Sequence, residues 1–266
     1  MIKAAVLGSP ISHSLSPKIH SRAYELLGLK SEYTAIEVDE KSFPDFFLKL
    51  KLSESGSDWS GFSLTMPLKE IVLQYCNAAD PIAKRIDSGN TLFRSNGSWQ
   101  VTSTDYLAFH NLLKVSKDSK VAIIGGGGTA RAAIGSLNSR VEEVDVLLRS
   151  ESRVPALAKA APDLKVNKLD MTNDLDEYDI IIQTTPAGVF DEYVSNTTRA
   201  KGTLLEALYK PSPTNLAIHY KELGGEVITG KELLVEQALF QIELFTGKKF
   251  DFTEMRSALL SVIASD

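Results

Sequence analysis

Short apolar runs alternate with amphipathic stretches along the first third of the chain. Runs with the length and flanking turns of strands lie at 3–7, 32–38 and 61–65. Helices are predicted from 16 to 28, over 43–52, and after Met66-Pro67. Ser16 suits the N-cap of the first helix, and Pro17 and Pro67 suit the first position of their helices. The pattern predicts a βαβαβα order.

A hairpin is predicted next, where β-like runs at 90–94 and 99–102 flank Ser95-Asn96-Gly97-Ser98. An Asn-Gly step between two such runs is a strong signal for a two-residue hairpin turn. A helix predicted over 104–115 then leads into the second half of the chain.

The second half opens with the spacing of a βαβ unit. Its parts are a strand at 119–124, a glycine turn, a helix over 129–137 and a strand at 143–148. Further strands are predicted at 179–182, 203–207 and 226–228, and two helices at 232–246 and 252–264. Asp251 with Glu254 resembles a capping box for the last helix.

The central position of the glycine turn predicts two domains in this chain of 266 residues. The predicted fold is α/β and two-lobed, with an N-terminal α/β substrate domain and a Rossmann-type, doubly wound dinucleotide domain. The C-terminal helices are expected to return to the first lobe. The predicted bounds are 1–103 plus 230–266 for the first domain and 104–229 for the second.

Composition narrows the class of partner. The net charge is −5, the pI is near 5.5, and no long Lys/Arg block occurs, so neither nucleic acid nor a membrane is an expected partner. Cys76 is the only cysteine, and the four histidines lack metal-ligand spacing, so no metal site is predicted. Without a signal peptide or a span-length apolar run, the expected location is cytoplasmic.

Gly125, Gly127 and Ala130 fit the G-x-G-x-x-G/A fingerprint of dinucleotide sites. A glycine-rich turn of some unrelated α/β protein is the alternative. Leu148-Arg149-Ser150 lies at the tip of the second strand, where an arginine accommodates the 2′-phosphate of NADP. Asp145, the nearby acid, falls inside the strand. We therefore predict NADP with Arg149 as the main contact; the alternative is a solvated arginine.

Three polar segments fall at strand-to-helix turns, at 12–17, 61–69 and 103–105. Such turns project from the carboxyl ends of strands, where ligand sites gather in α/β sheets. Lys69, near a helix N-terminus, is suited to passing protons if a carboxylate orients it, and Asp105 is the candidate. The alternative is that Lys69 is a solvated lysine and Asp105 an ordinary helix residue.

These segments, in this order, resemble the shikimate dehydrogenase family over nearly the whole chain. Residues 8–17 match its G-x-P-I-x-H-S-x-S-P signature, and Thr65-x-Pro67-x-Lys69 matches its T-x-P-x-K. The further matches, in family order, are Asn90-Thr91, Thr104-Asp105, the glycine turn, Thr185-Pro186-x-Gly188 and Gln237. An ordered set of this kind is far more specific than any one motif.

The resemblance implies reversible, NADP-dependent interconversion of 3-dehydroshikimate and shikimate, with Lys69 and Asp105 as the catalytic pair. It implies that Ser14, Ser16 and Tyr209 bind the substrate carboxylate, and that Thr65, Asn90, Asp105 and Gln237 bind the ring hydroxyls. The residues expected to bind NADP (or NADPH) are Gly125, Gly126, Gly127, Gly128, Thr129, Ala130, Arg149, Ser150, Thr185 and Gly230. The serines could instead simply cap a helix, and Gln237 could be an exposed helical residue.

Several positions depart from the family's usual pattern. Serine replaces asparagine at Ser63 and Ser103, and Asp87-Ser88-Gly89 replaces a G-A-V-like step. In the nucleotide half the departures are Leu148 and Gln183 for asparagine, Val189 for methionine and Glu206 for aspartate. These departures bear on the positioning of the site and on the fit of the cofactor more than on the reaction.

Two other functions stay open at this point. One is a quinate/shikimate dehydrogenase of broader specificity that uses NADP or NAD, and the other is a non-catalytic NADP-binding regulatory protein. Retention of both Lys69 and Asp105 favours an enzyme, because a pure binding module has no need of a lysine–carboxylate pair. A monomer or a homodimer is expected.

Overall fold

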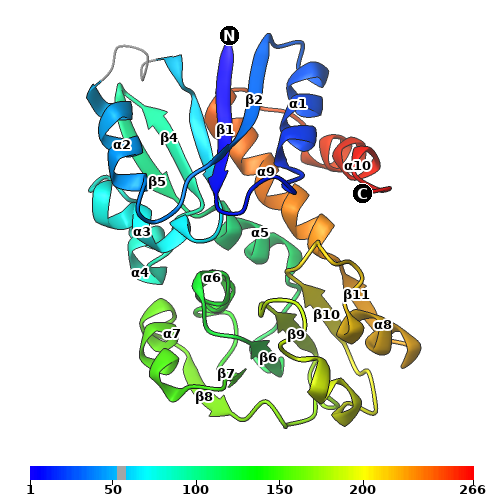
Figure 1. The fold of residues 1–266 in the computed structure, drawn as a ribbon. Coiled ribbons are helices and arrows are strands. Elements are labelled where there is room, and N and C mark those ends of the chain that lie inside the picture. The colour runs from blue at the N-terminus through cyan, green and yellow to red at the C-terminus, as the bar shows by residue number, and fades with distance from the viewer. Residues whose placement is uncertain (53–57) are drawn as a thin grey trace. The chain divides into compact units, whose positions relative to one another are not determined.

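The computed structural model describes residues 1–52 and 58–266. The chain divides into two compact units, the first formed by residues 1–104 and 235–266 and the second by residues 105–234. The chain passes between the units within α5 (Thr104–Leu112) and within α9 (Gly230–Thr246) (Figure 1). Most of α9 and all of α10 (Phe252–Val262) belong to the first unit, so the C-terminal helices return to it as predicted.

A five-stranded sheet of order β2-β1-β3-β4-β5 forms the centre of the first unit. Its strands are β1 (Ile2–Gly8), β2 (Ser31–Glu37), β3 (Gly61–Leu64), β4 (Thr91–Ser95) and β5 (Ser98–Thr102). β1 is parallel to β2 and β3, whereas β4 is antiparallel to β3 and β5. The helices of this part of the chain are α1 (Ser16–Leu26), α2 (Phe43–Leu52), α3 (Leu68–Tyr75) and α4 (Pro81–Ile86). The predicted βαβαβα order is confirmed.

The two faces of this sheet differ in character. On one face, Phe47 of α2 and Val72 of α3 belong to an apolar cluster with Leu7 and Phe62 of the sheet. Side chains alternate between faces along a strand, so Ser63 points to the other face from Phe62. That second face carries buried polar side chains from α1 and α9 at its centre, and these lead into the candidate site.

Two helix starts differ from the prediction. Ser16 is not the N-cap of α1 but its first residue; Leu15 is the N-cap, and no side chain caps the helix. The Ser14 hydroxyl instead accepts the Ser16 amide N–H at 3.3 Å. Pro67 is likewise the N-cap of α3 rather than its first helical residue. The first-turn N–H groups of a helix have no intrahelical partner, so proline is tolerated at several positions there and marks a start without fixing its register.

The predicted hairpin between β4 and β5 is confirmed. Ser95 and Ser98 are the last paired residues, and the turn between them has positive φ at both positions, 49° at Asn96 and 79° at Gly97. This is the backbone of a type I′ turn, which asparagine and glycine adopt at low cost.

A six-stranded parallel sheet forms the centre of the second unit, in the order β11-β10-β9-β6-β7-β8. Its strands are β6 (Val121–Ile124), β7 (Glu143–Leu147), β8 (Lys165–Leu169), β9 (Ile180–Gln183), β10 (Thr203–Glu206) and β11 (Glu226–Ile228). Numbered within the unit, this is the order 3-2-1-4-5-6 of a doubly wound Rossmann sheet. The principal helices are α6 (Gly128–Leu137), α7 (Val154–Ala160) and α8 (Asn215–Glu222), with 3-10 turns at Glu151–Arg153 and Asp191–Asn196.

The sequence pattern does not predict α7 or β8. β8 lies at the edge of the sheet, and its five residues KVNKL are all exposed or half-buried, so the strand carries little apolar periodicity. The cap predicted for α10 is confirmed, since the Asp251 side chain accepts the N–H groups of Thr253 and Glu254. Among the described residues, no helix combines the length and the apolar composition needed to cross a membrane.

His20 of α1 is fully buried on the polar face of the first sheet. Its ring stacks on Tyr33 with centroids 4.1 Å apart, Nδ1 lies 3.1 Å from the Tyr24 hydroxyl, and Nε2 lies 3.2 Å from Gln241 Oε1. The other end of the Gln241 amide faces the Asn90 carbonyl, which can only accept, so that end is the NH₂ group. His20 Nε2 therefore donates its proton to Gln241, and Nδ1 accepts from Tyr24.

Burial lowers the pKa of His20 from 6.5 to about 3. The unfolded chain therefore binds a proton at a higher pH than the folded one, and this contribution to stability is complete above pH 6.5 and is lost as pH falls toward 3. In this window we expect the free energy of unfolding to fall by about 1.4 kcal/mol per pH unit because of His20. Denaturant unfolding of the wild type and of His20→Gln at several pH values measures the difference in slope, and equal slopes would contradict it.

Candidate active site

The polar turns of the first unit meet at one end of its sheet. β1 and β3 are parallel neighbours, so the turns that follow them lie side by side. The Ser9 N–H donates to the Met66 carbonyl at 3.1 Å across these turns. Asn90, which precedes the antiparallel β4, lies at the same end, and its carbonyl accepts the Leu64 N–H at 2.8 Å. Tertiary structure thus brings together segments that are far apart in sequence.

Asn90, Thr104 and Gln237 form a buried, hydrogen-bonded group in this unit. Asn90 Oδ1 accepts the Thr104 N–H at 2.7 Å, and Asn90 Nδ2 donates to Gln237 Oε1 at 3.1 Å and to Thr104 Oγ1 at 2.9 Å. The Thr91 hydroxyl lies 3.0 Å from that of Thr104. Gln237 is 7% exposed, so it is not the solvent-facing helical residue of the alternative reading. Two of the residues predicted to bind ring hydroxyls are therefore in direct contact.

Lys69 is half-buried at the second position of α3. Its carbonyl accepts the Gly89 N–H at 2.7 Å, so the backbone of Lys69 is tied to the residue before Asn90. A Cβ on Gly89 would overlap with the Val101 side chain, and Asp87 ends α4 in the left-handed conformation with φ of 49°. Within the Asp87-Ser88-Gly89 departure, Gly89 thus has a local explanation, because glycine fits beside Val101 without overlap.

The remaining predicted site residues divide between the two units. Those in the first unit are Ser14 and Thr65, both half-buried, and Ser16, which is buried. Asp105, which is 7% exposed and lies in the first turn of α5, and Tyr209, which is half-buried after β10, belong to the second. The predicted catalytic pair therefore has one residue in each unit. The residues predicted to bind the substrate carboxylate also come from both units.

The glycine turn of the second unit follows β6 at the point where the strand order reverses. Gly125 has φ of 110°, and a Cβ there would lie 2.5 Å from Thr184 Oγ1, in the turn after the neighbouring β9. Gly127 is the N-cap of α6, and nothing lies within 4 Å of the position its Cβ would take. Ala130 is fully buried against the sheet.

This geometry fits the pyrophosphate of a dinucleotide. Gly125 permits the tight turn, the open space at Gly127 lets a ligand approach the backbone, and the amides of the first turn of α6 have no intrahelical acceptor. Gly128 and Thr129 belong to that first turn. The side chain of Arg153 lies beside the turn, since a Cβ on Gly126 would be 2.9 Å from Arg153 Cβ and 3.0 Å from Leu148 Cδ2.

An exposed arginine follows β7, and the nearby acid within the strand is already hydrogen-bonded. Arg149 and Ser150 are exposed after the strand. Asp145 lies inside β7, where one carboxylate oxygen accepts from Asn167 Nδ2 at 2.9 Å and the other from the Tyr178 hydroxyl at 2.7 Å. Burial and the bond to Asp145 both raise the pKa of Tyr178, so this contact persists at neutral pH. Asp145 is therefore not placed as the ribose-binding acid of an NAD site.

Gln183 and Glu206 shape the turns after β9 and β10, and the predicted cofactor contact Gly230 packs against the second of these turns. Gln183 Oε1 accepts both the N–H and the hydroxyl of Thr185, at 2.9 and 3.0 Å. The Glu206 carboxylate accepts from the Leu208 N–H and the Thr214 hydroxyl, and burial raises the pKa of Glu206 to about 7. A Cβ on Gly230 would overlap with the Leu208 carbonyl, so packing requires glycine there whether or not a cofactor is bound.

The sequence pattern does not identify Gln241, which lies one helical turn after Gln237 on α9. Its side chain is 1% exposed and contacts His20, Ser63, Asn90 and Thr91. The i, i+4 spacing of two glutamines on one helix was the available signal, because it places them on one face. That signal does not say which face is buried.

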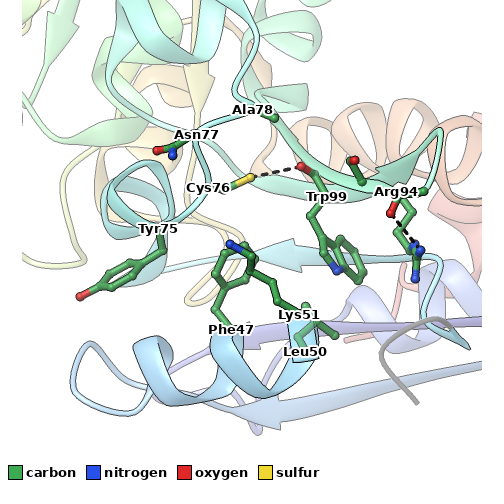
Figure 2. A pocket seen from close by; sticks show the side chains of 11 residues that line it. Phe47, Leu50, Lys51, Tyr75, Cys76, Asn77, Ala78, Arg94 and Trp99 are labelled. Carbon is green, nitrogen blue, oxygen red and sulfur yellow. Dashed lines mark hydrogen bonds between the residues drawn. The ribbon is translucent and has the colours of Figure 1, made fainter. Parts of the chain in front are cut away.

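A separate hollow of about 450 Å³ lies in the first unit (Figure 2). Its walls include Phe47, Tyr75 and Trp99, and no predicted site residue lines it. The Cys76 thiol donates to the Trp99 carbonyl at 3.3 Å, and burial raises the pKa of Cys76, so the thiol is a poor nucleophile at neutral pH. Within residues 1–52 and 58–266, no three His, Cys, Asp or Glu side chains are grouped so that they could hold a metal ion.

Comparisons with known proteins agree with this arrangement over nearly the whole chain. Residues 6–92 match the model for the shikimate dehydrogenase substrate binding domain, and residues 108–201 match that for shikimate/quinate 5-dehydrogenase. Residues 230–260 match the shikimate 5′-dehydrogenase C-terminal domain.

Individual relatives give the same result. The chain is 32% identical over 254 residues to shikimate dehydrogenase (NADP(+)) of Exiguobacterium sp., covering 94% of both chains. It is 31% identical to that of Staphylococcus epidermidis, covering 100% of this chain and 98% of the relative. Mycobacterium tuberculosis shikimate dehydrogenase superposes with a TM-score of 0.86 at 31% identity, covering 98% of this chain and 100% of that chain. The Thermus thermophilus enzyme in complex with NADP(H) and shikimate gives 0.84 at 27% identity, covering 99% and 100%. With both units and their connecting helices matched, the chain belongs to the shikimate dehydrogenase family.

Proposed function

We propose that this protein is an NADP-dependent shikimate dehydrogenase that interconverts 3-dehydroshikimate and shikimate. The observation that carries the proposal is the meeting of the β1 turn, the Thr65–Lys69 turn, Asn90 and Gln237 at one end of the first sheet, in a chain whose second unit is a Rossmann domain. Its relatives carry the name shikimate dehydrogenase (NADP(+)).

The first unit takes the substrate and the second takes NADP in this proposal. The proposed domains, 1–103 with 230–266 and 104–229, have bounds close to those of the compact units, which end at 104 and 234. The match of residues 6–92 to the substrate binding domain of the family supports the first assignment. The glycine turn at the switch point supports the second.

The substrate roles follow from the chemistry of a polyhydroxylated ring acid. Ser14, Ser16 and Tyr209 bind the carboxylate, while Thr65, Asn90, Asp105 and Gln237 bind the hydroxyls. A site that pairs each hydroxyl with a neutral donor or acceptor discriminates against analogues that lack one, because its own buried polar groups would be left unpaired. The mutual contact of Asn90 and Gln237 at 3.1 Å supports their acting together.

Lys69 and Asp105 handle the proton in the proposed mechanism. The Lys69 amine exchanges a proton with the substrate oxygen that alternates between hydroxyl and carbonyl, and the Asp105 carboxylate orients that amine and balances its charge. NADP, when bound, accepts or supplies the hydride. The glycine turn and the first turn of α6 hold its pyrophosphate, with Thr185 and Gly230 as further contacts, and Arg149 with Ser150 binds the 2′-phosphate.

A quinate/shikimate dehydrogenase is the second candidate, because the model matched by residues 108–201 describes both activities. Absorbance at the NADPH band separates the two. Purified protein is assayed with shikimate or quinate, each with NADP or NAD. Fast turnover with shikimate and NADP alone supports the proposal, comparable turnover of quinate supports the second candidate, and nucleotide binding without turnover of either acid would contradict both.

Replacing Lys69 tests the mechanism. Lys69→Ala removes the proton-transfer group, so we expect kcat to fall by about 10² to 10⁴ while NADP binding, measured by calorimetry, is unchanged. Lys84→Ala, at an exposed lysine of α4 in the same unit, is the matched control and keeps full activity. A Lys69→Ala enzyme that retains most of its rate would rule out this role.

Replacing Arg149 tests the choice of nucleotide. Losing a charge-assisted contact to phosphate should raise the KM for NADPH by about tenfold or more in Arg149→Ala, with little change in the KM for the ring acid. NADH lacks the 2′-phosphate, so its KM is the internal control and stays the same. Equal changes in the KM for NADPH and the KM for NADH would mean that Arg149 does not bind the 2′-phosphate.

A further inference from the structure

Ser63 is a departure from the family pattern whose side chain contacts a residue that also contacts Asn90. Asparagine is typical at this position, whereas Ser63 here ends in a single buried hydroxyl on β3. That hydroxyl accepts from the Tyr33 hydroxyl at 2.6 Å and donates to Gln241 Oε1 at 2.6 Å. The serine is therefore in direct contact with a carboxamide that comes from another part of the chain.

The Gln241 carboxamide is fully engaged. Its Oε1 accepts from Ser63 and from His20 Nε2, and its Nε2 donates to the Asn90 carbonyl at 3.2 Å and to the Thr91 hydroxyl at 3.0 Å. All four of its hydrogen-bonding positions are satisfied, and the residue is 1% exposed. Both contacts made by Nε2 lie at the start of β4, directly behind the Asn90 side chain.

The contacts of Gln241 help to set the orientation of the Asn90 side chain. Gln241 holds the Asn90 backbone carbonyl, and the Thr91 hydroxyl that it contacts donates to Asn90 Oδ1 at 3.2 Å. With Oδ1 fixed by this hydroxyl and by the Thr104 N–H, Asn90 Nδ2 points toward Gln237. Removing the Gln241 amide would take one donor from the Asn90 carbonyl, which keeps the Leu64 N–H, and one donor from the Thr91 hydroxyl, so the side chain of Asn90 would lose part of its support.

We propose that Gln241 is a positioning residue for the substrate site, and that its carboxamide replaces the one an asparagine at position 63 would supply. Only one carboxamide fits between β3 and the start of β4, because Ser63 Oγ already lies at hydrogen-bond distance from Gln241 Oε1. Ser63 and Gln241 are thus a compensating pair: the amide is supplied by Gln241 of α9 and not by an asparagine of β3. The inference rests on the proposed role of Asn90 in binding the ring hydroxyls.

An amide-exchange experiment tests the pair. Gln241→Ala should raise the KM for shikimate by about tenfold, with kcat within about threefold and the KM for NADP unchanged, because a lost support for Asn90 weakens ring binding only. Ser63→Asn alone should raise the KM for shikimate as well, since two carboxamides crowd one place. The double variant Ser63→Asn/Gln241→Ala should return that KM to within about threefold of the wild type.

Return of the KM for shikimate in the double variant is the decisive result. If Gln241 had only a general structural role, an asparagine at position 63 would not restore the KM that Gln241→Ala had raised. Gln100→Ala, at a half-buried glutamine of β5 in the same unit, is the matched control and leaves both KM values unchanged. Gln241→Met, which keeps the volume without the amide, replaces the alanine variant in both backgrounds if thermal melting shows that alanine unfolds the protein.

The outcomes separate this inference from the proposed function. A wild-type protein without turnover of shikimate and NADP would contradict the proposed function itself. An active wild type whose Gln241 variants keep the normal KM for shikimate, or a double variant no better than the Gln241 single variant, would overturn the compensating pair.

Discussion

The carboxamide of Asn90 joins the start of β4 to two other parts of the chain, one of which is far away in sequence. It contacts the start of α5 through Thr104 and helix α9 through Gln237, which is 147 residues away. These bonds are buried, so water does not compete for them, and each group left unpaired would carry its full desolvation cost. The geometry of the candidate substrate site in the first unit depends on this junction more than on any single apolar contact.

A layer of uncharged polar residues behind this junction keeps it in one arrangement. The direction of each bond is determined by groups that can act in one way only: the Asn90 carbonyl accepts, so Gln241 presents its NH₂ group there and its oxygen to His20. Burial keeps His20 neutral through the physiological range, which preserves this direction. A network with one consistent set of donors holds its members more firmly than the same residues would on a solvated surface.

The departures from the family pattern are accommodated in different ways. Gly89 and Glu206 are each explained by neighbours in the same unit, Val101 beside the first and the Leu208 turn around the second, whereas nothing in the structure explains Leu148. Ser63 differs, because its partner Gln241 lies 178 residues later in the chain. In the second unit, Asp145 is held by Asn167 and Tyr178, and the exposed Arg149 after the strand is the residue that we propose for the 2′-phosphate.

The sequence alone determined what depends on neighbours within a few residues. The Asn96-Gly97 turn, the Asp251 cap, the glycine turn at Gly125 and the order of most strands were predictable, because backbone preference and apolar spacing act locally. Local rules could not place the N-cap of α1, the edge strand β8 or the partner of Ser63. Only the tertiary structure decided these, because proline is tolerated along a whole first turn, an edge strand needs little apolar surface, and a buried amide is paired by whichever element folds against it.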